Sequence, residues 1–398
     1  MALWQLARRG ISVVGFEQFT PGHDGAATGG ESRVFRIAYH EGTHYVPLLL
    51  AARDLWGQLE EAVPAELLDR CGYLEIAKSD DEGFAISEAS LAGHGLAHEV
   101  LAAEAARDRF PQHRFRDDDV ALFDPLGGTL RPEYSVVRAT RLAESLGARV
   151  LRYTPVERID PGPDSVTVRT ATRQWRFRRA VVTVGSWTSR LLPELDGIVE
   201  PRRLSLTWFP ALDPARFSSK VFPAFGRTVD GLFIYGAPVV DGRSVKVSFV
   251  QFEPPGTVDP DHLEPAVPHD VLERLREIVR EYLPGLVPDP VRVSMFADGF
   301  TPDGNGLVGL HPGHRSLIIV AGLSGHGFKL APLFGKVAAD LAVSGETPEP
   351  VGFLGPARFL APSNKSRATP GPVTSPPHSS ERRVQSAELL TTPQRRSP

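Results

Sequence analysis

The sequence predicts an α/β fold in which a discontinuous, doubly wound parallel sheet receives an inserted second domain with a mixed or antiparallel sheet. Near both ends of the chain, apolar strand signals are followed at once by helix signals, a pattern typical of parallel sheets. Between residues 204 and 290 the pattern changes to hairpin-like strands. The length of 398 residues fits two large units better than one core.

The individual elements follow in chain order. Apolar residues at helical spacing that stop at Gly10 predict a helix over 1–9, and the next run predicts a strand over 11–16. The same signals predict helices at 45–61, 136–146 and 329–343, and strands at 149–153, 165–170, 174–177, 180–184 and 316–321. In the inserted domain they predict strands at 231–237 and 244–252 and a helix at 270–283.

Composition excludes several classes of function. Lys and Arg total 44 against 48 Asp and Glu, a net charge of −4, so no overall basic field would recruit nucleic acid. The single cysteine, Cys71, excludes an internal disulfide and a cysteine-rich metal site, and it fits a reducing compartment. No window has the roughly 18 apolar residues of a membrane span, and no signal peptide is evident. We expect a cytoplasmic monomer without a metal, nucleic-acid or membrane partner.

Residues 361–398 differ from the rest of the chain. They include seven Pro and seven Ser, no aromatic residue, and six basic against two acidic side chains. Such a segment cannot bury enough apolar surface to offset its ordering entropy. We expect a disordered tail.

Glu17 follows the strand expected at 11–16. An acid at the carboxyl end of such a strand can accept hydrogen bonds from the ribose of a bound dinucleotide, although an ordinary surface residue is the alternative. That acid normally follows a G-x-G-x-x-G turn by about 20 residues, and the sixteen residues before Glu17 contain no such turn. We expect the first strand and the phosphate loop to lie upstream of Met1.

A glycine-rich turn, Gly-Leu-Ser-Gly-His-Gly-Phe-Lys at 322–329, lies between a predicted strand and a predicted helix. Backbone N–H groups in such a turn can face a ligand that carries negative charge. A flavin fits, because its pyrimidine edge becomes anionic on reduction. A plain strand-to-helix turn is the alternative interpretation.

Several stretches together resemble one family over roughly residues 1–360. They are Arg33-Val-Phe-Arg36, Tyr39-His-Glu-Gly-Thr-His-Tyr-Val-Pro47, Val184-Gly-Ser-Trp187, Tyr235-Gly236 and the turn at 322–329. This ordered set resembles the monomeric sarcosine oxidase and N-methyltryptophan oxidase family of FAD-dependent amine oxidases, which has a DAO-like fold. The resemblance implies an FAD-binding domain of residues 1–66, 130–196 and 302–345. It implies a substrate domain of residues 67–129, 197–301 and 346–360.

The resemblance also implies roles for single residues. Arg36 and Lys329 match the positions that bind the substrate carboxylate, and Tyr235 matches a substrate-contacting tyrosine. Arg33 matches the cation beside the flavin ring, and Lys246 matches the lysine over its reactive face, where fixed positive charge favours the reduction of oxygen. The expected catalytic residues are therefore Lys246, Arg33 and Tyr235. The expected cofactor contacts are Glu17, Arg33, Val156, Gly185, Trp187, Gly325, His326, Gly327 and Lys329.

The chain departs from the family at four places. Ser294 stands where members tether the flavin through a cysteine, so FAD is expected to be noncovalent. Thr28-Gly29 replaces a pair of histidines, Val250 replaces an active-site histidine, and Phe296 replaces an aromatic hydroxyl.

The implied activity is FAD-dependent oxidation of the C–N bond of an N-methyl or other secondary amino acid, with oxygen as acceptor and hydrogen peroxide as product. Two alternatives stay open. One is a non-catalytic truncated remnant that cannot hold FAD, and the other is an FAD dehydrogenase of the same fold that uses another acceptor. The motifs of zinc hydrolases, serine hydrolases and P-loop proteins are missing from the sequence.

Overall fold

A computed structural model describes residues 1–249, 257–264 and 266–360. These described residues belong to one compact unit. Val250 and the tail expected to be disordered at 361–398 lie outside the described residues. No helix within the described ranges is long and apolar enough to cross a membrane.

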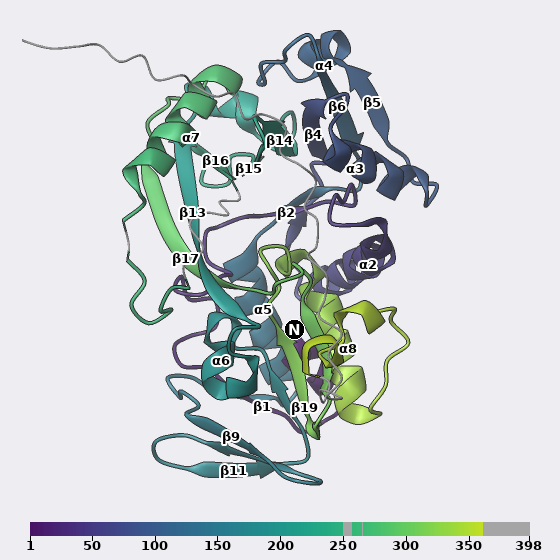
Figure 1. Cartoon of the computed structure of the whole chain (residues 1–398), viewed down its shortest axis with the longest axis vertical. Coiled ribbons are helices and arrows are strands. Elements are labelled where there is room, and N and C mark those ends of the chain that lie inside the picture. Colours follow the sequence, from purple (N-terminus) through teal and green to yellow (C-terminus); the bar gives the residue numbers. More distant parts are fainter. Residues whose placement is uncertain (250–256, 265, 361–398) are drawn as a thin grey trace, which may run out of the picture. The chain divides into compact units, whose positions relative to one another are not determined.

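Two parallel strand pairs form the parallel part of the fold (Figure 1). The pairs are β1 (Val14–Phe16) with β8 (Arg149–Leu151), and β12 (Ala180–Val182) with β19 (His314–Ala321). β18 (Leu307–His311) pairs with β19 in the antiparallel direction. The two pairs belong to separate hydrogen-bonded sheets within the described part of the chain.

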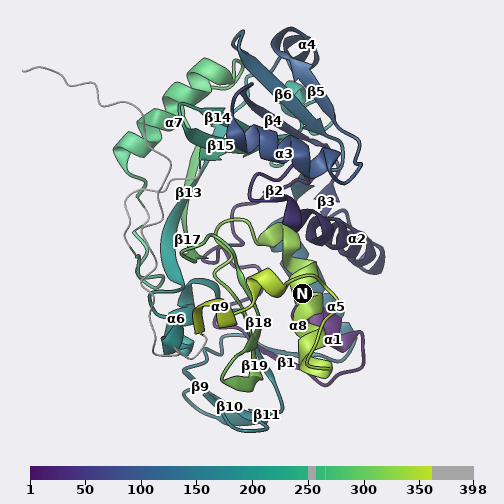
Figure 2. The ribbon, with the colours of Figure 1, turned by 45° about the vertical axis from the view of Figure 1, so that its right-hand side comes forward.

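Helices cover these strands and lie close to one another. They are α1 (Ala2–Ala7), α2 (Val46–Ala62), α5 (Pro132–Ser145) and α8 (Ala331–Val343). α1 packs on α8 and α5, and Figure 2 shows these three helices together. α1 approaches α8 so closely that a Cβ at Gly335 would lie 2.7 Å from the Cβ of Met1. Glycine at this position therefore permits the contact.

The largest sheet has eight strands in the order β17-β13-β16-β15-β14-β4-β6-β5. Their bounds are β17 (Arg292–Phe300), β13 (Glu200–Pro210), β16 (Ser244–Phe249), β15 (Leu232–Ala237), β14 (Ala224–Val229), β4 (Tyr73–Lys78), β6 (Asp119–Asp124) and β5 (Glu99–Ala102). Only the pairing of β14 with β4 is parallel among these described strands. The sheet is thus mixed and mostly antiparallel, as predicted.

Short elements complete the described chain. Two small antiparallel sheets contain β9 (Arg158–Pro161), β10 (Val166–Arg169) and β11 (Gln174–Phe177), and β2 (Arg33–Phe35), β7 (Gly128–Leu130) and β3 (Leu68–Asp69). The remaining α-helices are α3 (Glu82–Ala92), α4 (Ala103–Arg109), α6 (Thr188–Leu191), α7 (His269–Tyr282) and α9 (Ala357–Leu360). The 3-10 turns are η1 (Thr43–Tyr45), η2 (Gly185–Trp187), η3 (Pro193–Leu195), η4 (Pro214–Phe217), η5 (Phe328–Leu330) and η6 (Gly352–Leu354).

β2 has a central place in this arrangement. It contacts β14 and β15 of the large sheet and also η5, which directly follows the glycine-rich turn. The first hydrophobic core surrounds α2 and α8, and the second lies between α7 and the large sheet. β2 therefore lies where residues of the parallel region and of the large sheet come together. The division into an FAD-binding and a substrate domain stays a prediction.

Candidate active site

Two arginines at β2 belong to different clusters of charge. Arg33 begins the strand, and Arg36 directly follows its end. Residues three apart in extended chain point to opposite faces, so the two guanidinium groups diverge. The first group of residues, called the Arg36 cluster, contains Arg36, Tyr39, His40, Glu41, His326 and Lys329. The second, called the Lys246 cluster, contains Glu31, Arg33, Tyr235, Lys246 and Asp298.

Arg36 is buried, with 5% of its surface exposed, and it has an internal carboxylate partner. Its Nη2 atom donates to both carboxylate oxygens of Glu41, at 2.7 and 2.8 Å. Its Nη1 atom donates to the carbonyl oxygen of Ala38 at 2.8 Å and lies 3.2 Å from Nδ1 of His40. Sequence reasoning assigned no role to Glu41, although this residue lies within one of the motifs that carried the resemblance.

Lys329 and Arg36 both lie near the ring of Tyr39. The Tyr39 ring is fully buried, with the Arg36 guanidinium 4.7 Å and the Lys329 ammonium 5.1 Å from its centroid. Lys329 Nζ also donates to the carbonyl oxygen of His326 at 3.2 Å. The Tyr39 hydroxyl lies 2.8 Å from Nδ1 of His326. The Tyr39 ring is thus close to two basic side chains, which it attracts through its quadrupole.

Burial and neighbouring charges shift the pKa values of the Arg36 cluster. Burial, followed by Arg36, lowers the pKa of Lys329 to about 7, and Glu41 opposes both effects. Burial, followed by Arg36, lowers the pKa of His40 to about 4. Burial alone would raise the pKa of Glu41, but Arg36 and His40 hold it far below its ordinary value. Just below pH 7 the cluster therefore carries a net charge of about +1, with Arg36 and Lys329 positive and Glu41 negative.

A second carboxyl group, that of Glu75 on β4, lies in the electrostatic field of Arg36. Its Oε2 atom accepts hydrogen bonds from the hydroxyls of Tyr73 at 3.2 Å and Ser87 at 3.0 Å. Burial raises the pKa of Glu75 to about 7, and Arg36 and the two hydrogen bonds oppose that rise. Nothing in the sequence pattern of β4 indicated this group.

Lys246, on β16, is fully buried and donates to the carbonyl oxygen of Ser32. Burial lowers the pKa of Lys246 well below its ordinary value, and Arg33 lowers it further, whereas Glu31 and Glu133 raise it. Within the described residues, neither Lys246 nor Arg33 lies within 4.0 Å of a carboxylate oxygen. The partly buried Arg33 and the buried Lys246 thus share one cluster without a direct ion-pair partner there.

Arg33 is fixed by backbone carbonyl groups. It donates to the carbonyl oxygens of Ser32 and Ala27, both at 2.7 Å, and to that of Gly29. Burial lowers the pKa of Arg33, an effect that Tyr235 opposes. The structure therefore brings Arg33, Tyr235 and Lys246 together.

Asp298 links the Lys246 cluster to the glycine-rich turn. Its carboxylate accepts hydrogen bonds from the amides of Gly299 at 2.8 Å and Gly325 at 3.0 Å. Burial raises its pKa, and these amides together with Arg33 oppose that rise. Because His326 and Lys329 belong to the other cluster, the turn contacts both.

Backbone geometry explains the composition of the turn. Gly322, Ser324 and Gly325 all have positive φ, at 60°, 51° and 82°. Ser324 adopts this unfavourable region while its hydroxyl contacts the carbonyl oxygen of Gly322 at 3.1 Å and the amide of Thr301 at 3.2 Å. A Cβ at Gly327 would collide with Leu323. The glycines therefore serve a tight, specific backbone path.

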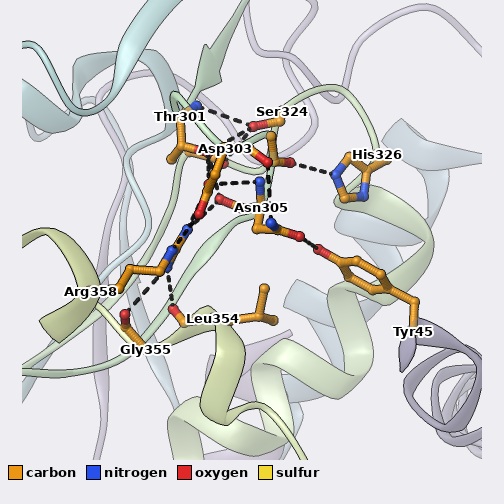
Figure 3. A network of polar contacts seen from close by, with 11 residues as sticks. Tyr45, Thr301, Asp303, Asn305, Ser324, His326, Leu354, Gly355 and Arg358 are labelled. Carbon is orange, nitrogen blue, oxygen red and sulfur yellow. Dashed lines mark hydrogen bonds and ion pairs between the residues drawn. The ribbon is translucent and has the colours of Figure 1, made fainter. Parts of the chain in front are cut away.

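A polar network supports the turn from the side of the 301–305 loop (Figure 3). Arg358 donates to Asp303 Oδ2 at 2.8 Å and to the carbonyl oxygen of Asn305 at 2.7 Å. The Tyr45 hydroxyl donates to Asn305 Oδ1 at 2.7 Å. Nε2 of His326 lies 3.0 Å from the carbonyl oxygen of Gly304, so the loop holds the ring that contacts Tyr39.

The remaining expected cofactor contacts lie in two further places. Glu17, at the end of β1, accepts from the amide of Phe19 at 2.8 Å, and its carbonyl oxygen accepts from Thr154 at 2.8 Å. This contact brings the segment of Val156 beside Glu17. Gly185 has φ of 56° and begins η2, and the Trp187 indole donates to Asp261 at 2.7 Å.

The family departures also have structural consequences. A side chain at Gly29 would collide with the ring of Phe296, so these two replacements fit one another. Ser294 is partly exposed on β17, where it pairs with Leu206 of β13. Cys71 contacts Thr129 at 3.6 Å and lies outside both clusters.

The residues present fit an FAD molecule. The basic side chains of the partly buried Arg33 and the buried Lys246 suit a ring system that gains negative charge on reduction. The buried hydroxyls of Ser32 and Ser186 have no hydrogen-bond partner among the described residues, which suits a polar ligand. Ser186 belongs to η2, and a Cβ at Gly299 would lie 3.6 Å from the Gly185 carbonyl and 3.5 Å from Gly322 Cα. The two expected cofactor-binding turns therefore adjoin.

Comparisons with known proteins agree with these observations. The model of the FAD dependent oxidoreductase (DAO) family matches residues 1–341. Monomeric sarcosine oxidase from Bacillus sp. (strain NS-129) is 32% identical over 352 residues, which cover 86% of this chain and 90% of that protein. N-methyl-L-tryptophan oxidase from Salmonella agona (strain SL483) is also 32% identical, over 350 residues that cover 86% and 90%.

Solved structures extend the similarity to the fold. NikD, described as an unusual amino acid oxidase essential for nikkomycin biosynthesis, matches with a TM-score of 0.77 and 25% identity over 89% of this chain and 93% of that one. L-proline dehydrogenase from P. horikoshii also has a TM-score of 0.77, at 21% identity over 90% and 94%. The chain therefore belongs to the FAD dependent oxidoreductase (DAO) family, and FAD is its cofactor.

Proposed function

We propose that the protein oxidises the C–N bond of an N-methyl or other secondary amino acid, with oxygen as acceptor and hydrogen peroxide as product. The observation that carries this proposal is the Arg36 cluster, where two buried cations, Arg36 and Lys329, lie on the same tyrosine ring. The named activities of the similar oxidases, on sarcosine and N-methyl-L-tryptophan, support the same substrate class. When bound, FAD would supply the redox chemistry, namely acceptance of a hydride equivalent from the substrate and return of the electrons to oxygen.

The net charge of the Arg36 cluster suits one carboxylate. Glu41 already neutralises much of Arg36, so the charge left for the ligand is that of Lys329. A substrate carboxylate that binds here would bring the cluster from about +1 to neutral. We infer that Arg36 and Lys329 form a carboxylate clamp, that is, a pair of side chains that binds the substrate carboxylate. This clamp orients the amino acid, so that its amine end points away from Arg36 and Lys329.

Apolar groups support a substrate larger than sarcosine. Phe233 lies against His40, with ring centroids 4.6 Å apart, and 5.7 Å from the Arg36 guanidinium. Phe296 stands where the resembled site has a hydroxyl. Polar sites discriminate strongly against ligands that leave them unpaired, whereas one methylene is worth only about 1–3 kcal/mol. We therefore propose an N-methylated or cyclic amino acid of greater bulk as the preferred substrate.

The test begins with purified protein saturated with FAD. N-methyl amino acids, proline and their methyl esters are mixed with it anaerobically, and flavin bleaching gives the rate of reduction. Air is then admitted, and peroxide is measured. We expect the bulkier acids to reduce the flavin faster than sarcosine does, the esters to react much more slowly than the acids, and peroxide to appear in proportion to flavin reoxidised.

Three outcomes would decide against parts of the proposal. Equal rates for acids and esters would remove the carboxylate clamp. Reduction by amino acids without peroxide, but with turnover on an artificial electron acceptor, would favour a dehydrogenase. A protein that binds no FAD at saturating concentrations would favour the non-catalytic alternative.

A further inference from the structure

Three structural features distinguish Glu31, and the third connects it to Lys246. First, Glu31 has φ of 68°, a left-handed conformation that residues other than glycine rarely adopt. Second, its Oε2 atom accepts a hydrogen bond from the indole of Trp208 at 2.7 Å. Third, its amide donates to Oε1 of Glu133 at 2.8 Å, and the carbonyl of the next residue, Ser32, accepts from Lys246. Unfavourable backbone that is fixed at both ends is a recurrent sign of a functional position.

The strand register places Trp208 between two basic residues. In the large sheet Trp208 of β13 pairs directly with Lys246 of β16 on one side and with Arg292 of β17 on the other. Directly paired residues project from the same face of a sheet, so the three side chains form one row. The Arg292 guanidinium lies 4.1 Å from the centroid of the Trp208 ring. Glu31 therefore bonds to the middle member of a row whose other members are a lysine and an arginine.

A cavity of about 570 Å³ adjoins this row at Arg292. Glu31, Glu133 and Arg292 line it, whereas Lys246 does not. The charged groups that act on Lys246 are Glu31, Glu133, Arg292 and Arg33, and the first three are these lining residues. Glu66 lines the same cavity but is not among the groups that act on Lys246, which makes it a matched control.

We propose that Glu31, oriented by the Trp208 indole, is a positioning residue that holds the buried Lys246 in its cationic form for the transfer of electrons to oxygen. Arg33 and Arg292 repel a proton on Lys246, and the carboxylates of Glu31 and Glu133 attract it. Of these two carboxylates, Glu31 has the indole bond that ties it to the Lys246 row. The inference rests on the proposed function, because it assigns Lys246 to the oxygen step.

The experiment compares Glu31→Gln with Glu66→Gln, both loaded with FAD. A pH titration of the visible spectrum of the bound flavin reports the charge of Lys246 without turnover. We expect the midpoint of that titration to fall by about one pH unit or more in Glu31→Gln, since the loss of a nearby opposite charge changes a pKa by this order. Glu66→Gln should titrate like the wild type.

Stopped-flow kinetics supply the second measurement. Above the midpoint, oxygen should reoxidise reduced Glu31→Gln about tenfold more slowly than wild type, because a midpoint lower by about one pH unit reduces the cationic fraction about tenfold there. Anaerobic reduction by substrate should be unchanged, because it does not depend on Lys246 in this scheme. If Glu31→Gln fails to fold, Trp208→Phe replaces it, and we expect a smaller fall of the midpoint.

The outcomes separate this inference from the proposed function. A flavin titration midpoint that is the same in Glu31→Gln, Trp208→Phe, Glu66→Gln and the wild type would overturn the role of Glu31, even if peroxide is formed. A wild-type protein that oxygen reoxidises slowly at every pH would overturn the oxygen acceptor. In that case a lowered midpoint in Glu31→Gln would still support Glu31 as the group that sets the charge of Lys246. An unchanged midpoint would overturn both the oxygen acceptor and the role of Glu31.

Discussion

Ser294 predicts that the flavin is bound noncovalently. Its hydroxyl cannot form the thioether that a cysteine would form with a flavin, and Cys71 contacts Thr129 instead of either cluster. Acid precipitation of the holoprotein should therefore release all yellow colour into the supernatant. The measurement is flavin absorbance in the supernatant and the pellet, and flavin retained in the pellet would contradict noncovalent binding. Ser294→Cys is the informative companion, because it restores the one atom that the tether requires.

Lys329 should make the binding of a carboxylate ligand depend on pH. Burial lowers its pKa to about 7 in the ligand-free protein, and a carboxylate ligand prefers the cationic form. The dissociation constant of propionate should therefore be constant below pH 7 and rise about tenfold per pH unit above it. Titrations that follow flavin absorbance from pH 6 to 9 measure it. Lys329→Met should bind weakly at every pH, whereas Lys336→Met, on the helix α8 that follows, should behave as wild type. A flat wild-type profile would contradict the assignment.

The sequence indicated Arg36 and Lys329 but not Glu41, the carboxylate that offsets part of their positive charge. Glu41 is five residues from Arg36, and only the path of the chain between β2 and η1 brings its carboxylate onto the guanidinium. Glu31 and Trp208 are 177 residues apart, so no local pattern could join them. Residue identity at a motif can be read locally, whereas the charge balance of a buried site depends on contacts between distant segments.

At the scale of the element, the turn at 322–329 depends on a loop that the sequence did not indicate. Arg358 fixes Asp303 and Asn305, and the loop in turn holds His326 against Tyr39. Arg358→Gln removes a charge-assisted hydrogen bond worth roughly 1.5–3 kcal/mol. Because Arg358 acts on the ligand only through the loop and His326, we expect part of this loss to reach the ligand and propionate binding to weaken by about tenfold.

The control for this prediction is Arg315→Gln, which removes an exposed arginine on β19. The double variant Asp303→Asn with Arg358→Gln should bind no more weakly than the worse single variant, because both disrupt one interaction. Strictly additive losses would show that Arg358 does not act through Asp303.

Elements with clear periodicity were predicted almost to the residue. The helix expected at 45–61 is α2 (Val46–Ala62), and the strand expected at 174–177 is β11 (Gln174–Phe177). The strand expected at 11–16 was too long, since only Val14–Phe16 pairs with a neighbour. No element was predicted between residues 67 and 129. β4 there is buried on both faces except at Lys78, so it lacks the alternation that marks a half-exposed strand.

At the scale of the whole molecule, one buried histidine couples folding to pH. His113 is 3% exposed and stacks on Phe222, with ring centroids 5.1 Å apart. Neither of its ring nitrogens has a hydrogen-bond partner among the described residues. Burial, and secondarily Arg227, lowers the pKa of His113 to about 3. The folded protein therefore holds this ring neutral within the second hydrophobic core.

The sign of the effect follows from the difference between folded and unfolded states. A histidine whose folded pKa is depressed binds its proton more readily after unfolding, so stability falls as pH drops below the unfolded value of about 6.5. At pH 5 the cost is about 2 kcal/mol, from about 1.4 kcal/mol per pH unit over about 1.5 pH units. His113→Phe removes this penalty. Relative to wild type, its free energy of unfolding in urea should therefore improve by about 2 kcal/mol between pH 7.5 and pH 5.

Phe222→Leu separates packing from titration in the same core. This variant loses contact with the His113 ring but keeps the titrating group, so it should destabilise the protein by a similar amount at both pH values. The informative quantity is therefore how the difference in free energy of unfolding between each variant and the wild type changes with pH, rather than the size of that difference at one pH. If His113→Phe and Phe222→Leu showed the same pH dependence, the acid sensitivity would have to come from another group. Glu75 could not supply it, because its pKa is raised to about 7 and its contribution to stability is lost only as the pH rises.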